Sequence, residues 1–302
     1  MMAMEEIRLR AFQPIFFYKR GQEYVMNEVR KKKKTKNKNA LGSGLIISPS
    51  EIEEMISRLC QASPYAYEEE LKKGYLTVEG GHRIGIGGEM NPGETGQIQS
   101  VKHIAYLNIR IAHEIKTAGE RIVPYLYQNG KLQNILIVSP PGYGKTTLLR
   151  DLIRRISNGS LYAKGMTVGV VDERGEISGS YQGVPQNDIG IRTDCITACK
   201  KSTGMMLLLR SMAPMVIAVD ELAGEEDQKA VFSVLGSGCK ILASIHGESI
   251  SELEKKPWFL PFLREEVFQT IIILRKKEGI FMAKIMEKRS EAWQLLGDFA
   301  LS

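Results

Sequence analysis

Short apolar runs recur through the second half of the sequence, and they limit its fold more than any other feature does. Each run is apolar at consecutive positions, so the strand that it predicts would be buried on both faces. Helical patterns separate most of the runs, as in parallel sheets that helices cover on both sides. The second half is therefore predicted to be a three-layer α/β domain with a mainly parallel sheet. Its predicted strands are 135–138, 167–171, 215–219, 241–245 and 270–274.

The first half has a mixed pattern that predicts a smaller α+β domain. The segments IRLRAF and IFFY alternate as strands do, and Ser50 is expected to cap the helix that follows it. A second helix is expected to end at Gly74. Two short alternating runs joined at Gly80 and Gly81 then predict a β-hairpin.

Length and composition are those of a globular chain with two domains. The 302 residues allow two domains at roughly 150 residues each, and 43% apolar with 25% charged residues is ordinary. We expect an α+β domain over 1–125 and an α/β domain over 126–302, with LNIRIAHEI leading to a linker near Pro124. No stretch is long and apolar enough to span a membrane, and MMAMEEIRLR is too acidic for a secretory signal. With four cysteines, these features predict a reduced, cytoplasmic protein.

The basic character of the chain comes from one local tract. Seven positive charges lie between residues 30 and 38, and without them the formal net charge of +6 becomes −1. A solvated basic loop over 30–40 is expected, and contact with nucleic acid or with an anionic membrane surface are the alternatives. The charged residues are Arg30, Lys31, Lys32, Lys33, Lys34, Lys36 and Lys38.

A glycine-rich segment directly after the first apolar run matches the P-loop, or Walker A, pattern with one departure. Gly142 and Gly144 would let backbone N–H groups turn toward a polyphosphate, and Lys145 would reach the β and γ phosphates. Thr146 would offer an oxygen to Mg²⁺ at the start of an apolar-faced helix. Ser139 stands where the pattern has its first glycine. The predicted nucleotide-binding residues are Ser139, Pro140, Pro141, Gly142, Tyr143, Gly144, Lys145, Thr146 and Thr147.

Two adjacent acids end a later apolar run and would complete a hydrolytic site. Asp220 and Glu221 follow the predicted strand 215–219, and ligands bind beyond the carboxyl ends of strands in such sheets. We expect Asp220 to support the metal ion and Glu221 to act as the base that orients and deprotonates water.

Two other predicted strands also end on polar residues. Asp172 and Glu173 follow the strand 167–171 and are candidates for metal or water positioning, although a surface ion-pair loop would have the same pattern. His246 follows the strand 241–245 and is a candidate donor to the γ-phosphate. A hydrogen-bonded histidine without chemistry is the alternative.

The order of these motifs resembles that of the secretion ATPases of type II and type IV systems. In that family a P-loop, an acidic Asp box, a Walker B segment and a His box follow one another along a RecA-like domain. The corresponding residues here would be Lys145 and Thr146, Asp172 and Glu173, Asp220 and Glu221, and His246. The resemblance covers about half of the chain. It implies a RecA-like P-loop NTPase domain with ATP as substrate and Mg²⁺ as metal ion.

Nearly the whole chain is similar to the stage III sporulation protein AA family. The similar segments are VEGGHRIGIGG, LNIRIAHEI, VGVVDERGEISG, GVPQNDIGIRTD and MMLLLRSMAPMVIAVDE. The resemblance implies a cytoplasmic ATPase that is held at the membrane by integral membrane proteins. Its hydrolysis of ATP would drive or assemble a channel between mother cell and forespore. A shorter N-terminus and the basic tract depart from the family pattern.

Secretion ATPases are usually rings, so the resemblance also implies a hexamer in which an arginine acts on the nucleotide of a neighbouring subunit. A desolvated arginine near the γ-phosphate contributes on the order of 10³-fold or more in rate. The candidates are Arg110, Arg174, Arg192 and Arg210. Arg192 and Arg210 are assigned to the catalytic set, and at least two of the four are expected to be surface or ion-paired residues.

The sequence is compatible with two other functions. A nucleic-acid-stimulated P-loop ATPase is supported by the basic tract alone, so nucleic acid is not the predicted partner. A nucleotide-binding switch that scarcely hydrolyses is suggested by Ser139 in place of the first glycine.

Overall fold

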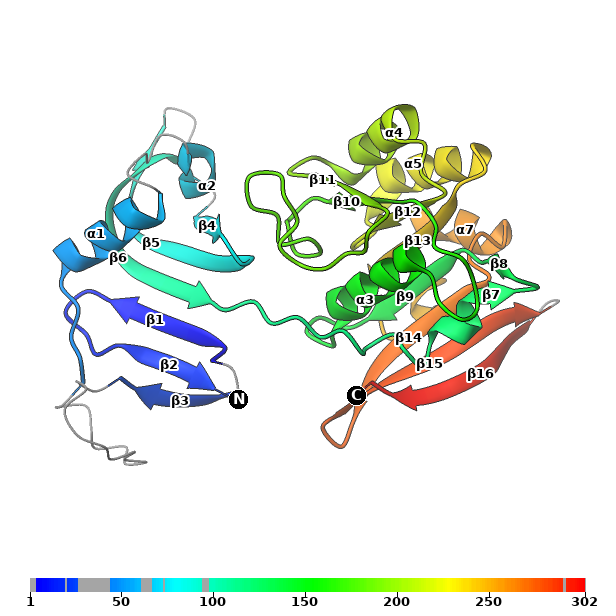
Figure 1. Cartoon of the computed structure of the whole chain (residues 1–302), viewed down its shortest axis with the longest axis horizontal. Helices are drawn as coiled ribbons and strands as arrows, with labels where there is room; N and C mark the ends of the chain where they lie inside the picture. Colours follow the sequence, from blue (N-terminus) through cyan, green and yellow to red (C-terminus); the bar gives the residue numbers. More distant parts are fainter. Residues whose placement is uncertain are drawn as a thin grey trace. The chain divides into compact units, whose positions relative to one another are not determined.

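The chain forms two compact units in the computed structural model, Met1–His113 and Glu114–Ser302. The model describes residues 4–19, 21–26, 44–60, 67–72, 74–93, 98–289 and 292–301 (Figure 1). The second unit begins before the expected boundary at residue 126. The basic tract 30–38 lies outside the described residues.

The first unit is built on a six-stranded antiparallel sheet with the strand order β3-β2-β1-β6-β5-β4 (Figure 1). Its strands are β1 (Glu6–Arg10), β2 (Phe16–Lys19), β3 (Gln22–Val25), β4 (Tyr75–Val78), β5 (His82–Pro92) and β6 (Ile98–Arg110). Gly80 and Gly81 connect β4 to β5 with φ of 85° and 72°, which confirms the predicted hairpin. LNIR, which was expected to lead into a linker, instead ends the long strand β6.

Two helices, α1 (Pro49–Leu59) and α2 (Glu68–Lys72), contact strand β6 of this sheet. The N-cap of α1 is Ser48, and not Ser50 as expected. The side chain of Ser48 accepts a hydrogen bond from the Glu51 N–H, and Glu51 bonds back to the Ser48 N–H. Pro49 suits the first helical position because its φ is already helical and no N–H is needed there.

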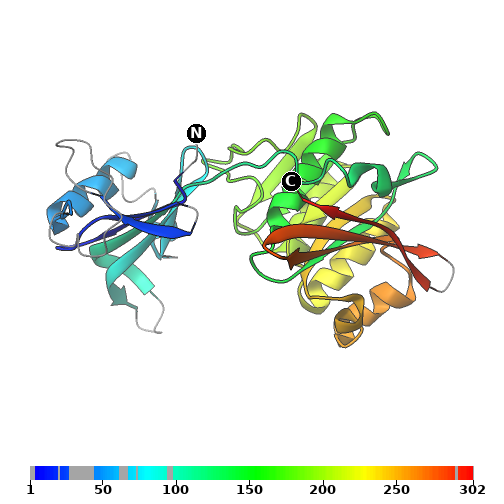
Figure 2. The same cartoon turned by 90° about the horizontal axis from the view of Figure 1, so that it is seen from below.

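The second unit contains an eight-stranded sheet with the order β11-β10-β12-β13-β9-β14-β15-β16. From β11 through β14 in this spatial order, neighbouring strands are parallel. Strands β15 and β16 add two antiparallel pairings and are drawn in orange to red in Figures 1 and 2. The strands are β9 (Ile135–Ser139), β10 (Val168–Asp172), β11 (Thr193–Thr197), β12 (Val216–Val219), β13 (Lys240–His246), β14 (Thr270–Lys277), β15 (Ile280–Arg289) and β16 (Ala292–Ala300).

Helices cover both faces of the sheet, so the unit has the three predicted layers. The helices are α3 (Lys145–Asn158), α4 (Lys201–Ser211), α5 (Gly224–Gly236), α6 (Ile250–Leu253) and α7 (Leu260–Arg264). The shorter elements are η3 (Val123–Leu126), η4 (Pro257–Phe259) and the hairpin of β7 (Tyr127–Gln128) and β8 (Lys131–Leu132). Among the described residues, no helix has the length and apolarity that a bilayer crossing requires.

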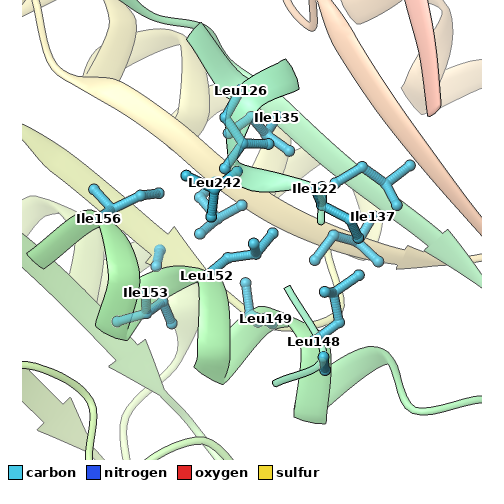
Figure 3. Close-up of a cluster of buried hydrophobic side chains, with 14 of the residues drawn as sticks. Ile122, Leu126, Ile135, Ile137, Leu148, Leu149, Leu152, Ile153, Ile156 and Leu242 are labelled. Atoms are coloured by element: carbon cyan, nitrogen blue, oxygen red, sulfur yellow. The ribbon is translucent and has the colours of Figure 1, made fainter. Parts of the chain in front are cut away.

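Alternate residues of each central strand enter two different apolar cores. Ile135 and Ile137 of β9 pack in one core with Leu149 and Leu152 of α3 (Figure 3). Leu136, between them, belongs to the second core, which includes residues of α4, α5 and α7. Because successive side chains of a strand point to opposite faces, a run that is apolar throughout can fill both cores.

All five strands predicted in this half are present, and the sheet has three further strands, β11, β15 and β16. Thr193–Thr197 forms β11 at one edge, and Ala292–Ala300 forms β16 at the other. Most of their side chains are only half-buried or exposed. The segment after residue 270 forms the antiparallel pair β14 and β15, and β16 pairs with β15 and takes the edge position.

The segment 114–122 belongs to the second unit because it is bonded to α3. The Gly119 N–H donates to Asp151 Oδ2 at 2.7 Å, and Arg155 Nε lies 3.0 Å from the same oxygen. Gly119 lies so close to α3 that an added Cβ would be 2.5 Å from Leu152 Cδ2. Arg154 also donates to Asp151, whose side chain is fully buried.

We expect Asp151→Ala to lower the free energy of unfolding of the second unit by about 3 kcal/mol, because it leaves Arg154, Arg155 and the Gly119 N–H without their buried acceptor. Urea unfolding followed by circular dichroism measures this loss. Glu120→Ala is the control, since the Glu120 side chain is 65% exposed and 3.7 Å from Arg155, and should cost less than about 0.5 kcal/mol. Equal effects of the two substitutions would contradict the anchoring role of Asp151.

Candidate nucleotide-binding site

The glycine loop connects the end of β9 to the start of α3. Gly142 and Gly144 have φ of 76° and 84°, a region that side chains disfavour, and Gly144 is the N-cap of α3. Apart from the two residues adjacent in the chain, no residue has an atom within 4 Å of the position that a Cβ would take at either glycine. The glycines are therefore required by backbone conformation, and the space beside them is open.

The loop presents a row of unpaired backbone donors. In the part of the chain that the structure describes, no acceptor bonds to the N–H groups of residues 142–147, and the first bond of the helix is Leu148 N–H to Gly144 O at 2.9 Å. Unpaired amides at the start of a helix, together with the helix dipole, make an anion-binding site. The loop has the backbone arrangement that a polyphosphate needs.

Ser139 is accommodated where the P-loop pattern has its first glycine. It is the last residue of β9, pairs with His246 of β13, and is fully buried. Its hydroxyl donates to Pro140 O at 2.8 Å. Its φ is not in the left-handed region, so a side chain causes no backbone strain at this position.

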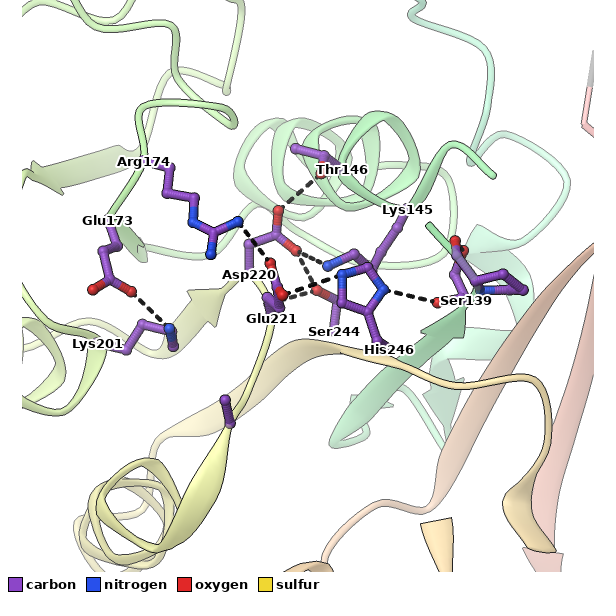
Figure 4. Close-up of polar contacts among 12 residues, drawn as sticks. Ser139, Lys145, Thr146, Glu173, Arg174, Lys201, Asp220, Glu221, Ser244 and His246 are labelled. Atoms are coloured by element: carbon purple, nitrogen blue, oxygen red, sulfur yellow. Dashed lines mark hydrogen bonds and ion pairs between the residues drawn. The ribbon is translucent and has the colours of Figure 1, made fainter. Parts of the chain in front are cut away.

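Asp220 joins the glycine loop to the neighbouring strands (Figure 4). One carboxylate oxygen is 2.8 Å from Lys145 Nζ, and the other accepts a hydrogen bond of 2.8 Å from Thr146 Oγ1. Ser244, on β13, donates its hydroxyl proton to the first of these oxygens. The Lys145 and Asp220 side chains are only 8% and 17% exposed.

The environment of Asp220 keeps its carboxyl group ionised. Burial by itself would raise the pKa of Asp220, but the Lys145 charge and the three hydrogen bonds outweigh burial and lower this pKa below its ordinary value. A lowered pKa in the folded state means that the pair stabilises the fold above the unfolded-state pKa of about 3.9. That stabilisation is lost as pH falls through the folded-state value. Asp220 is therefore an anion throughout the neutral range.

Glu221 is held in a different way from its neighbour. Its φ is 56°, and its N–H donates to Ser244 Oγ at 2.8 Å. The carboxylate lies between the His246 and Arg174 side chains, with Oε1 3.2 Å from His246 Nε2 and Oε2 3.3 Å from Arg174 Nη1 (Figure 4). His246 Nδ1 is in turn 3.3 Å from Ser139 O. These contacts connect Glu221 with the end of β9.

The second acidic pair does not join this cluster. Both oxygens of Asp172 are used by its own loop, in bonds from the Ile177 N–H at 3.2 Å and the Ser178 N–H at 2.7 Å, with the Ser178 hydroxyl at 2.6 Å. Glu173 bonds instead to Lys201 Nζ at 2.7 Å, at the start of α4 (Figure 4). Asp172 thus shapes the loop after β10, and Glu173 pairs that loop with α4.

Of the four candidate arginines, Arg174 lies beside the site residues. Arg192 Nη1 donates to Ser157 O at 2.9 Å, in the last turn of α3. Lys145 is the first residue of this helix, so Arg192 lies at the opposite end from the glycine loop. Arg210 is exposed in the last turn of α4, which leads into the beginning of β12, while Asp220 follows the end of that strand. Arg110 ends β6 in the first unit. The contacts of Arg192 and Arg210 therefore do not place them at the glycine loop of their own chain.

Two residues of the site have no counterpart among the sequence predictions. Ser244 is fully buried on β13 and bonds both to Asp220 and to Glu221. Arg150 of α3 donates to Glu176 O and Ile177 O, each at 2.6 Å, and ties the loop after β10 to the helix. Burial lowers the pKa of Arg150 from its usual value. The signal for Ser244 was its place two residues before His246, on the same face of the strand.

Some known proteins are similar to this chain in sequence, and others are similar in fold. The family described as "Sporulation stage III, protein AA" matches residues 1–292. Stage III sporulation protein AA of Bacillus subtilis (strain 168) is 39% identical over 276 residues, which are 91% of this chain and 84% of that protein.

Among solved structures, the Legionella pneumophila ATPase DotB has a TM-score of 0.61 at 14% identity, over 95% of this chain and 78% of DotB. The pilus retraction motor PilT with bound ADP has a TM-score of 0.62 at 14% identity, over 96% of this chain and 81% of PilT. These similarities confirm the RecA-like α/β fold of the secretion ATPases. The match over nearly the whole length, with the identity to the Bacillus subtilis protein, shows that the chain belongs to the stage III sporulation protein AA family.

Proposed function

We propose that this chain is an ATPase of the sporulation apparatus and hydrolyses ATP between the glycine loop and the strand-end acids. The observation that carries the proposal is the Asp220 carboxylate, which contacts both Lys145 Nζ and Thr146 Oγ1 at 2.8 Å. A lysine, a hydroxyl and an ionised acid thus meet at the open N-terminus of α3. P-loop NTPases use this combination to hold phosphates and a metal ion.

The residues present fit Mg²⁺. The Thr146 hydroxyl and the Asp220 carboxylate are oxygen donors, the type that Mg²⁺ prefers, and the lowered pKa of Asp220 keeps its charge available. When bound, Mg²⁺ would neutralise charge on the β and γ phosphates. Thr146 and Asp220 would hold it directly or through water, while Lys145 and the free N–H groups of residues 142–147 bind the phosphate oxygens.

We assign the role of the base to Glu221. It follows Asp220 directly, its side chain is 31% exposed, and its carboxylate is oriented by His246 and Arg174. In this role it accepts a proton from the attacking water. A base that is adjacent to the metal-supporting acid and oriented by two side chains supports hydrolysis over a switch that only binds nucleotide. Ser139 takes the place of the first glycine without backbone strain. This substitution therefore gives no support to a nucleotide-binding switch.

The family and the fold support a more specific biological role. Hydrolysis would drive or assemble a membrane-embedded channel between mother cell and forespore, from the cytoplasmic side and through integral membrane partners. PilT is a retraction motor and DotB an ATPase, which supports a mechanical use of ATP in a chain of this fold. We further propose a hexameric ring, in which an exposed arginine, Arg110 or Arg210, acts on the nucleotide of a neighbouring subunit.

Lys145→Ala and Glu221→Gln test the proposed site by separating binding from hydrolysis. Lys145→Ala should abolish both ATP binding and turnover, because it removes the phosphate-binding cation. Glu221→Gln should keep ATP binding and lower kcat by about 10²-fold or more, because the amide cannot accept a proton. Phosphate release measures turnover, and a fluorescent ATP analogue measures binding.

Lys201→Ala is the matched control, since it removes a lysine–carboxylate contact of 2.7 Å outside the loop and should leave both quantities unchanged. Turnover that survives in Glu221→Gln would contradict the assignment of the base. Absence of turnover in the unmodified chain with intact binding would favour the switch. Strong stimulation by added DNA or RNA would favour the nucleic-acid-stimulated ATPase.

Arg174→Ala and Arg192→Ala should affect different properties. Arg174 orients Glu221 through an exposed contact, so its loss should lower kcat about fivefold or less without changing the melting temperature. Arg192 bonds to a carbonyl oxygen in the last turn of α3, so its loss should lower the free energy of unfolding by about 1 kcal/mol and leave kcat unchanged. Phosphate release and thermal unfolding measure the two effects. Reversed effects would show that Arg192 belongs to the catalytic set.

A further inference from the structure

Ser244 connects the two acids of the proposed site through one hydroxyl group. Its Oγ donates a hydrogen bond to Asp220 Oδ1 and accepts one of 2.8 Å from the Glu221 N–H. The directions of both bonds are fixed, because an ionised carboxylate can only accept and a backbone N–H can only donate. Ser244 is fully buried, so water cannot replace the hydroxyl without a structural change.

The backbone of Ser244 also forms a hydrogen bond with the turn that follows Asp220. Its carbonyl oxygen accepts a hydrogen bond of 2.8 Å from the Leu222 N–H. The two residues after Asp220 are thus both bonded to Ser244, one to the side chain and one to the main chain. Glu221 lies between them with a φ of 56°, a conformation that a residue with a side chain keeps only when its surroundings determine it.

We propose that Ser244 is a positioning residue for the ATPase reaction, which fixes the Asp220 carboxylate for the metal ion and directs the Glu221 side chain toward the attacking water. The proposal rests on the proposed function of this site. Ser244 acts only through Asp220 and Glu221, and it does not touch the reacting atoms itself.

The other contacts of these acids do not duplicate this role. Lys145 and Thr146 also bond to Asp220, but both belong to the glycine loop, which binds the phosphates. Once those two groups engage nucleotide and metal, Ser244 is the described donor to Asp220 that stays with the sheet. His246 and Arg174 contact the Glu221 carboxylate, whereas Ser244 holds its backbone. Loss of the hydroxyl therefore disturbs both acids without changing any charge.

Ser244→Ala tests the proposal because it removes only this hydroxyl, and the full-length chain is used throughout. We expect kcat to fall about tenfold or more and the Mg²⁺ concentration for half-maximal turnover to rise about tenfold, the usual effect of losing a group that orients a metal ligand. Affinity for ATP measured in EDTA should stay unchanged, because the glycine loop is intact. Mn²⁺ binding in the presence of ADP, followed by electron paramagnetic resonance, should weaken by a similar factor.

Ser244→Thr and Ser157→Ala complete the set. Ser244→Thr keeps the hydroxyl and should restore both metal affinity and kcat. Ser157 is also fully buried and accepts the Arg192 N–H at 2.7 Å, but it lies at the far end of α3. Ser157→Ala should therefore lower the melting temperature while metal affinity and kcat stay at their unmodified values.

Unchanged metal affinity and kcat in Ser244→Ala would overturn the proposal. A lower melting temperature, together with a loss of ATP affinity in EDTA as large as the loss of metal affinity, would also overturn the proposal. That result would indicate a purely structural role for Ser244. An unmodified chain that binds Mn²⁺ with ADP but does not hydrolyse ATP would contradict the proposed function alone, and the Mn²⁺ comparison would still test Ser244. An unmodified chain that binds no Mn²⁺ with ADP would contradict both.

Discussion

The buried carboxylate of Asp220 is the interaction on which the organisation of this site depends. It accepts hydrogen bonds from the Lys145 ammonium and the Thr146 hydroxyl at the start of α3, and from the Ser244 hydroxyl on β13. The parallel sheet makes this possible, because β9, β12 and β13 are neighbours and all end at the same edge. A charge buried to this extent is tolerated only with such compensation. The same compensation gives the site an ionised oxygen ligand at neutral pH.

Two acids that are adjacent in sequence acquire different properties from their surroundings. Asp220 is surrounded by three donors that lower its pKa, which suits the metal-supporting role proposed for it. Glu221 turns away through a left-handed backbone conformation, and its more exposed carboxylate lies between His246 and Arg174. The proposed roles in metal support and water activation are thus separated by one change of backbone direction, at which the Glu221 N–H bonds to Ser244.

Sequence patterns could predict those parts of the molecule that local chemistry determines. The central strands were found because burial on both faces requires unbroken apolar runs, whereas the half-buried edge strands β11 and β16 have no such pattern. Lys145 and Asp220 could be assigned because one follows a glycine loop and the other ends a strand. The contacts of Asp172 and Arg192 depend on which segments meet in the folded chain. Ser244 was missed because a serine within an apolar run gives little local signal.

The attachment of segment 114–122 to α3 has a mechanical consequence. Arg154 Nη2 donates to Lys116 O at 2.7 Å, and Asp151 accepts the Gly119 N–H. The polypeptide that leaves the first unit at His113 is therefore fastened within a few residues to the helix that begins with Lys145. A force on this segment would therefore act on α3, a helix of 14 residues whose N-terminus follows the glycine loop.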